Sequence, residues 1–254
     1  MLKDENTVWL IFVTLLVIGG VLITKLGTAN LSNKYHNAIM YSAQALQRRL
    51  YSICEQDGYI ELTLTGTNEE KEDLIQYTCW LFARYLSWVH IYRRSLEFAG
   101  PPPRNDTGKP RGWLGTLFMG TLGTPSHADA LDAPCRFLPS FTQAIEELMI
   151  SSEHNDLRPM SWTSFHTKWA QDESFRHWFA PLETGLLLIA RKKHDHREAA
   201  PDHRLRKLQH ILVSAVHIWD PDGGELHRDH KKLCTAAPGC ECHSTECIKA
   251  RDKK

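Results

Sequence analysis

The sequence predicts an all-α protein with a single N-terminal transmembrane helix followed by an irregular helical bundle. Two observations lead to this fold class: an uncharged apolar run near the N-terminus, and apolar residues that recur at helical spacing through most of the remaining chain. The 254 residues, 42% hydrophobic and 24% charged, suit one sizeable domain or two small ones. We expect a membrane anchor with its flanks over 1–29, a helical domain over 30–223, and a Cys/His-rich basic tail over 224–254.

The anchor is predicted from residues 8–24, which carry no charge and span about 26 Å as a helix, near the short limit for crossing a bilayer. A helix that is apolar on every face suits lipid, and Trp9 lies where an interfacial aromatic is expected. The alternative is a cleavable signal peptide, because Gly27 and Ala29 have the spacing of a cleavage site. The expected localisation is a single-pass membrane protein, with a slight preference for a cytoplasmic C-terminal domain.

Two helices are expected directly after the anchor. The first covers about 32–53, where apolar residues follow helical spacing. The second begins with a capping box, in which Thr67 and Glu70 would satisfy one another's backbone amides, and it ends before Gly100. Between the two helices, residues 59–64 alternate in polarity and are expected to form an extended connector rather than a strand.

The second half of the chain contains three more predicted helical regions. A second capping box at Ser140 and Gln143 would start the first of them, and Pro181 should kink or restart a later one. The regions are marked by Trp162, Phe165 and Trp169 on one face, by apolar spacing over 175–189, and by a seam over 205–219.

The segment 100–139 is rich in Gly and Pro and shows no sustained period. Its apolar residues, among them Trp113 and Phe118, are too many for a plain solvated linker. We expect this segment to pack against its own domain, with a lid or a partner-binding segment as the alternatives.

Three segments together resemble a group of uncharacterised, mainly bacterial, predicted membrane-anchored helical proteins. They are CWLFARYLSWVHIYRRSLEF (79–98), CRFLPSFTQAIEELM (135–149) and RLRKLQHILVSAVHIWDPDG (204–223). The resemblance covers most of 35–223 and depends on aromatic and apolar positions. It implies the architecture and no site residue, because the group has no established activity.

The tail is the one region where residue spacing suggests chemistry. Thiolates and imidazoles at short intervals are the ligands that tetrahedral Zn²⁺ prefers. The predicted metal ligands are Cys234, Cys240, Cys242, Cys247 and His230, with His227 and His243 as replacements. The paired CxxC spacing of zinc knuckles is missing, so a disulfide-tied tail and an unstructured tail stay open as alternatives.

Other histidines and cysteines are expected to be structural. His196, His203, His210 and His217 repeat every seven residues on the side opposite the Leu205 seam, which predicts a solvated stripe. Cys79 lies on an apolar helix face and is predicted to be a core residue.

The composition and motifs favour a binding function. Thirty basic residues balance thirty acidic residues, so no nucleic-acid partner is expected. The sequence has no GxSxG, HExxH or dinucleotide motif, which makes an enzyme the less favoured class. We therefore predict a membrane-anchored, non-catalytic helical interaction module that contacts a protein partner and the bilayer and needs no cofactor. The alternatives are a metal- or thiol-dependent protein that uses the tail, with zinc as its cofactor, and an enzyme whose site is assembled from distant helices.

Overall fold

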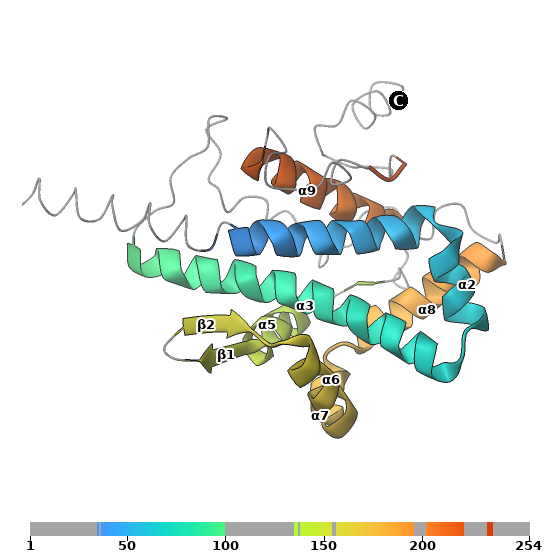
Figure 1. Cartoon of the computed structure of the whole chain (residues 1–254), viewed down its shortest axis with the longest axis horizontal. Helices are drawn as coiled ribbons and strands as arrows, with labels where there is room; N and C mark the ends of the chain where they lie inside the picture. Colours follow the sequence, from blue (N-terminus) through green and yellow to red (C-terminus); the bar gives the residue numbers. More distant parts are fainter. Residues whose placement is uncertain are drawn as a thin grey trace, which may run out of the picture.

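A computed structural model of the chain describes residues 35, 37–99, 135–136, 138–153, 156–195, 202–220 and 233–235, most of which are helical (Figure 1). The predicted anchor over 8–24 and nearly all of 100–139 and 224–254 lie outside these residues. Within the described ranges, no helix has the length and apolar character needed to span a membrane. The helical bundle is thus confirmed, and the anchor stays a prediction.

Two long helices form the centre of the bundle and run in opposite directions, side by side (Figure 1). They are the helix over 37–55 and α3 (Asn68–Ala99). The predicted capping box starts α3: the Glu70 amide donates to Thr67 Oγ1 at 3.2 Å, and the Thr67 amide donates to the Glu70 carboxylate at 2.8 Å. Arg49 lies over the ring of Tyr77 at 5.0 Å from its centroid and links the two helices.

The connection between the two long helices is itself a helix, α2 (Asp57–Thr65), so the expected extended connector is wrong. Tyr59 and Thr63 lie one helical turn apart, and both are buried. The Thr63 hydroxyl donates to the Tyr59 carbonyl at 2.7 Å. The alternation of polar and apolar residues over 59–64 is also typical of a strand. Here the segment is helical because one face of the helix is buried against α3 and against α8 (Ala180–His194).

The remaining elements cover both sides of this helix pair. α9 (His203–Trp219) lies along the helix over 37–55, where the Gln209 side-chain amide donates to Gln47 Oε1 at 3.1 Å. The other side of α3 carries a mixed group of short elements (Figure 1). These are α5 (Pro139–Leu148), the antiparallel hairpin of β1 (Ile150–Glu153) and β2 (Asp156–Pro159), and α6 (Trp162–Gln171). They are followed by α7 (Glu173–His177) and α8 (Ala180–His194).

Two of these helix starts test the sequence predictions. The capping box expected at Ser140 is wrong, because α5 begins at Pro139 with Leu138 as its N-cap and has no side-chain cap bond. Proline suits the first helical position, where its missing N–H costs nothing. The restart predicted at Pro181 is confirmed, since α7 ends at His177 and Pro181 lies in the first turn of α8.

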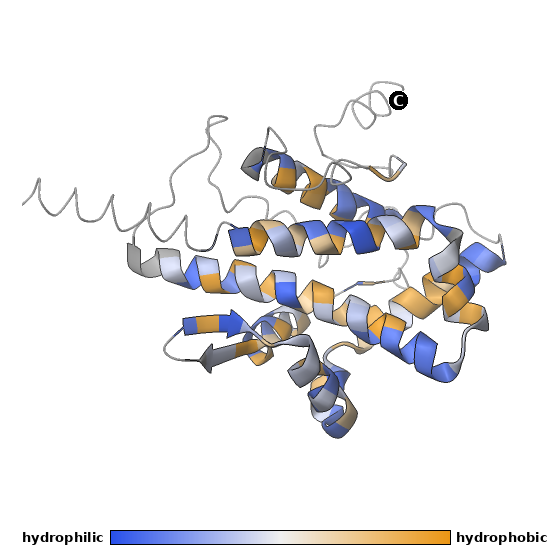
Figure 2. Ribbon diagram, in the orientation of Figure 1, coloured by the Kyte–Doolittle hydropathy of each residue, from blue (hydrophilic) through white to orange (hydrophobic). Residues whose placement is uncertain are grey.

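An aromatic cluster fills the core between α3 and the helices α6 to α8. The ring centroid of Phe165 lies 5.4 Å from that of Phe175 and 5.3 Å from that of Phe179, and all three side chains are buried. Trp162 and Trp169 extend the cluster from the same face of α6, as the sequence predicted. Figure 2 shows hydrophobic and hydrophilic residues mixed along α3, as expected for a helix with a face in this core.

Candidate functional site

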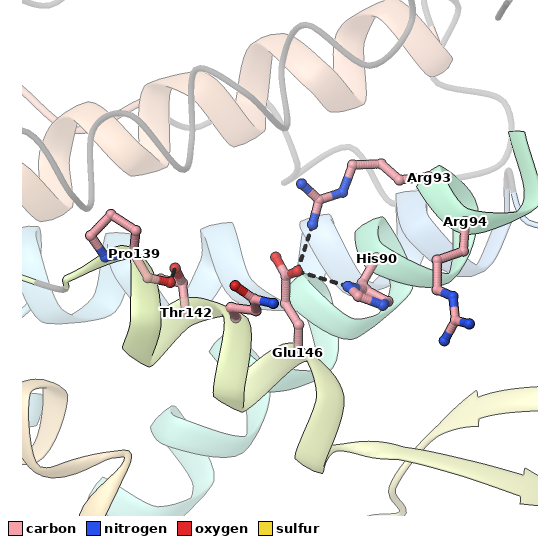
Figure 3. A pocket seen from close by; sticks show the side chains of 7 residues that line it. His90, Arg93, Arg94, Pro139, Thr142 and Glu146 are labelled. Carbon is pink, nitrogen blue, oxygen red and sulfur yellow. Dashed lines mark hydrogen bonds and ion pairs between the residues drawn. The ribbon is translucent and has the colours of Figure 1, made fainter. Parts of the chain in front are cut away.

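A pocket of about 340 Å³ opens between the C-terminal half of α3 and α5 (Figure 3). Helical spacing explains why these side chains converge, because residues three or four apart share a helix face. The pocket is lined by His90, Arg93 and Arg94 from α3 and by Pro139, Thr142, Gln143 and Glu146 from α5.

Glu146 is the buried acid of this pocket, with a side chain only 3% exposed. Its Oε2 accepts hydrogen bonds from the Arg93 guanidinium at 2.5 Å and from His90 Nδ1 at 2.9 Å. Two charge-assisted partners offset the cost of burying a carboxylate. Its other oxygen, Oε1, is buried and has no hydrogen-bond partner among the described residues. Glu146 therefore has an unused acceptor, which a donor from a bound group reaches only after the side chains that cover Oε1 move.

Arg94 supplies a second guanidinium, which is turned away from Glu146 (Figure 3). It makes no hydrogen bond or ion pair with any residue that the structure describes. Because Arg93 already faces the Glu146 carboxylate, Arg94 gives the pocket an excess of positive charge. A guanidinium binds carboxylates and phosphates in a planar, two-pronged geometry.

The described lining of the pocket combines a histidine–carboxylate pair with a single hydroxyl group. A histidine held by a carboxylate through Nδ1 resembles the acid–base pair of hydrolases, which also need a nucleophile nearby. Thr142 has the only hydroxyl among the described lining residues, and it donates to the Pro139 carbonyl at 2.8 Å. No serine or cysteine belongs to that lining. The arrangement can hold an anionic group and a hydrogen-bond donor at once.

The predicted metal ligands are only partly covered by the described residues. Cys234 is 0% exposed and lies against Cys54 and α9, while Cys240, Cys242, Cys247 and His230 lie outside the described residues. Within the described part of the chain, no group of three His, Cys, Asp or Glu side chains could hold a metal. The zinc site in the tail stays a prediction.

The burial of His210 corrects the predicted solvated stripe. His217 is exposed as expected, but His210 is 0% exposed and its Nε2 donates to the Cys234 carbonyl at 2.8 Å. The start of the tail covers this position on α9, a contact between residues 24 apart that helical spacing does not show.

A second polar cluster joins the end of the helix over 37–55 to α8 and α9. Asp202 is 0% exposed and accepts from Lys193 at 2.6 Å and from Arg206 Nε at 2.8 Å. Burial acts to raise the pKa of Asp202, but the hydrogen bonds and charges of Arg206 and Lys193 outweigh it, and the pKa lies below its usual 3.8. Lys193 also donates to the carbonyls of Ile53 and Cys54 at 3.1 and 2.6 Å. This cluster caps a helix end and has a structural role.

The residues that line the pocket were not predicted from the sequence as a site. The signal that could have found them is the spacing of His90 and Arg93, which lie one turn apart on the same face of an amphipathic helix. Their partner lies more than fifty residues away in the sequence, so the pair is visible only in the fold.

No protein-family model, curated protein or solved structure matches the chain.

Proposed function

We propose that the protein is a membrane-anchored, non-catalytic interaction module that binds an acidic segment of a partner protein in the pocket between α3 and α5. The observation that carries this proposal is that one pocket holds an exposed arginine, Arg94, and a buried carboxylate oxygen that has no described donor. The Arg94 guanidinium faces no described anion, and Glu146 Oε1 is buried without a described donor.

A polypeptide segment satisfies both groups at once. An Asp or Glu side chain would pair with Arg94, and a backbone amide near that side chain would donate to Glu146 Oε1 once the side chains that cover this atom move. The volume of about 340 Å³ lies at the small end of ligand pockets, which suits one or two side chains rather than a large cofactor.

Peptide binding tests the pocket. The probes are two capped hexapeptides of the same length, one containing two Glu residues and one containing Gln at those positions, titrated by calorimetry. We expect the Glu peptide to bind and Arg94→Ala to weaken its binding about tenfold, the effect of one lost charge-assisted contact. Arg191→Ala is the matched control, because Arg191 is an exposed arginine of α8 remote from the pocket lining.

The result that would refute the pocket proposal is equal binding of the Glu and Gln peptides, or equal weakening by the two arginine substitutions. Equal binding of the two peptides would mean that the acidic side chains do not contribute to binding. Equal weakening by the two arginine substitutions would mean that the peptide responds to the overall charge of the protein, or binds another surface. Failure of both peptides to bind would also count against it.

The membrane part of the proposal is supported by residues 8–24, whose uncharged length approaches that of a bilayer core. We expect the full-length chain to stay in the membrane fraction after an alkaline wash, and a chain starting at Ser32 to be released. Recovery of a mature chain beginning near Asn30 would instead support the signal-peptide alternative.

A further inference from the structure

Two buried cysteines from distant parts of the chain meet at the end of the helix over 37–55. Cys54 is 4% exposed and Cys234 is 0% exposed. Burial raises the pKa of the Cys54 thiol, and the Cys234 thiol raises it further, so the two side chains are close neighbours. Two buried thiols that the fold brings next to each other are the starting point for a disulfide bond.

The residues next to the two cysteines hold the two chain segments together. Glu55 Oε1 accepts from the Thr235 amide at 2.8 Å and from the Thr235 hydroxyl at 3.1 Å, across 180 residues of sequence. The Arg206 guanidinium also contacts both Glu55 and Thr235. These bonds hold the residues that follow the two cysteines, Glu55 and Thr235, against each other.

Cys234 is held by its own backbone as well. Its amide donates to Gln209 Oε1 at 3.1 Å, and its carbonyl accepts from His210 Nε2 at 2.8 Å. Five hydrogen bonds therefore hold the backbone of Cys54 and Cys234 and the residues that follow them.

We propose that Cys54 and Cys234 form a disulfide bond that ties residue 234, at the start of the tail, to the bundle. In the reaction each thiol gives up its hydrogen and a sulfur–sulfur bond forms. The two electrons and two protons pass to a disulfide oxidant, which is reduced to two thiols through a mixed-disulfide intermediate. Because both thiols are buried, the oxidant reaches them when residues 233–235 lift away or before the tail docks.

The proposal is independent of the pocket between α3 and α5, because none of the residues that line that pocket belongs to the cysteine contact. The proposal also means that Cys234, one of the predicted zinc ligands, would not bind zinc. A disulfide bond forms when an oxidant is added and persists in the presence of a chelator, whereas a zinc–thiolate site is lost when the metal is removed.

Peptide mapping of the oxidised full-length chain tests the bond. The chain carries Cys240→Ser, Cys242→Ser and Cys247→Ser, so that Cys234 is the only tail cysteine. It is incubated with oxidised glutathione and a chelator, alkylated under denaturing conditions and digested with trypsin. We expect peptide 50–71 to be linked to peptide 233–249, with the loss of two hydrogens.

Thermal melts of the same protein provide the second measurement. A disulfide bond between Cys54 and Cys234 closes the long loop between these two residues, and this should raise the Tm of the oxidised protein by roughly 10 °C over that of the reduced protein. Cys54→Ala and Cys234→Ala should each abolish both the linked peptide and this difference in Tm. Cys79→Ala, which removes another buried thiol of the core, is the matched control and should keep both.

Three results would overturn the proposal. The first is full alkylation of Cys54 and Cys234 after oxidation, and the second is linkage of Cys54 to Cys79 or Cys135 instead. The third is that the Cys54→Ala and Cys234→Ala chains show the same difference in Tm between oxidised and reduced protein as the chain with both cysteines. Both substitutions are small and leave the hydrogen bonds between Glu55 and Thr235 in place.

Discussion

Replacing Gly185 with alanine should destabilise the protein, although the same change elsewhere in a helix stabilises. Gly185 lies in α8, where the backbone of Cys135 passes unusually close. An added Cβ at residue 185 would lie 2.4 Å from the Cys135 backbone nitrogen and 2.6 Å from its sulfur. Real Cβ atoms do not approach other heavy atoms this closely, so α8 or the Cys135 backbone would have to shift.

The magnitude follows from two opposing effects. Alanine gains about 1 kcal/mol over glycine in a helix interior. A clash with backbone costs more than the usual 1–3 kcal/mol of an overpacked core, because a backbone atom cannot change rotamer. Cys135 already has a φ of 58°, in the left-handed region that non-glycine residues rarely adopt, which leaves it few other conformations. We expect a net loss of about 2 kcal/mol and a Tm lower by roughly 4–8 °C.

The assay is a thermal melt of Gly185→Ala beside Gly58→Ala. Gly58 is an exposed residue of α2, and a Cβ added there would meet no other atom within 4 Å. Alanine at residue 58 should therefore raise the free energy of unfolding by about 0.5–1 kcal/mol. The opposite signs of the two shifts are the expected result. If Gly185→Ala is as stable as the wild type, or gains as much as Gly58→Ala, the close approach of Cys135 to α8 is wrong.

Three further changes test other parts of the fold. Phe165→Ala should cost about 3–5 kcal/mol in urea unfolding, because its ring is fully buried; a loss under about 1 kcal/mol would contradict the aromatic core. The folded pKa of Asp202 lies below its ordinary 3.8, so its stabilisation is present above that pH and is lost as the pH falls further. Asp202→Asn should therefore be less stable than the wild type at pH 6, with a smaller difference at pH 3. Arg93→Met should cost about 1–2 kcal/mol, less than for a fully buried pair because Arg93 is 48% exposed. Adding Glu146→Gln should recover part of this loss, and strictly additive effects would refute the coupling.

Local chemistry accounts for the parts of the fold that the sequence predicted well. Thr67 and Glu70 are three residues apart, and Pro181 is restricted by its own ring, so each could be interpreted without knowing any tertiary contact. The long apolar seams of α3 and α9 are also confirmed, since helical periodicity accumulates over many residues.

The predictions that failed depend on tertiary contacts. Residues 59–64 form a helix because their neighbours bury Tyr59 and Thr63, and the four-residue strands of β1 and β2 were too short to give a period. His210 is buried because a distant segment covers it. The pocket was missed for the same reason, as His90 and Glu146 come from helices separated by the 100–139 segment.

The placement of the pocket has a consequence for the chain between α3 and α5. His90, Arg93 and Arg94 lie in the last turns of α3 before the chain leaves at Ala99, and Pro139 is where the chain re-enters the bundle as α5. The residues on the two sides of this long connection thus line the pocket. The acidic segment proposed above would contact α3 and α5 at once, and so would join the two points between which the chain leaves and re-enters the bundle. Its affinity would then depend on the separation of Ala99 and Pro139.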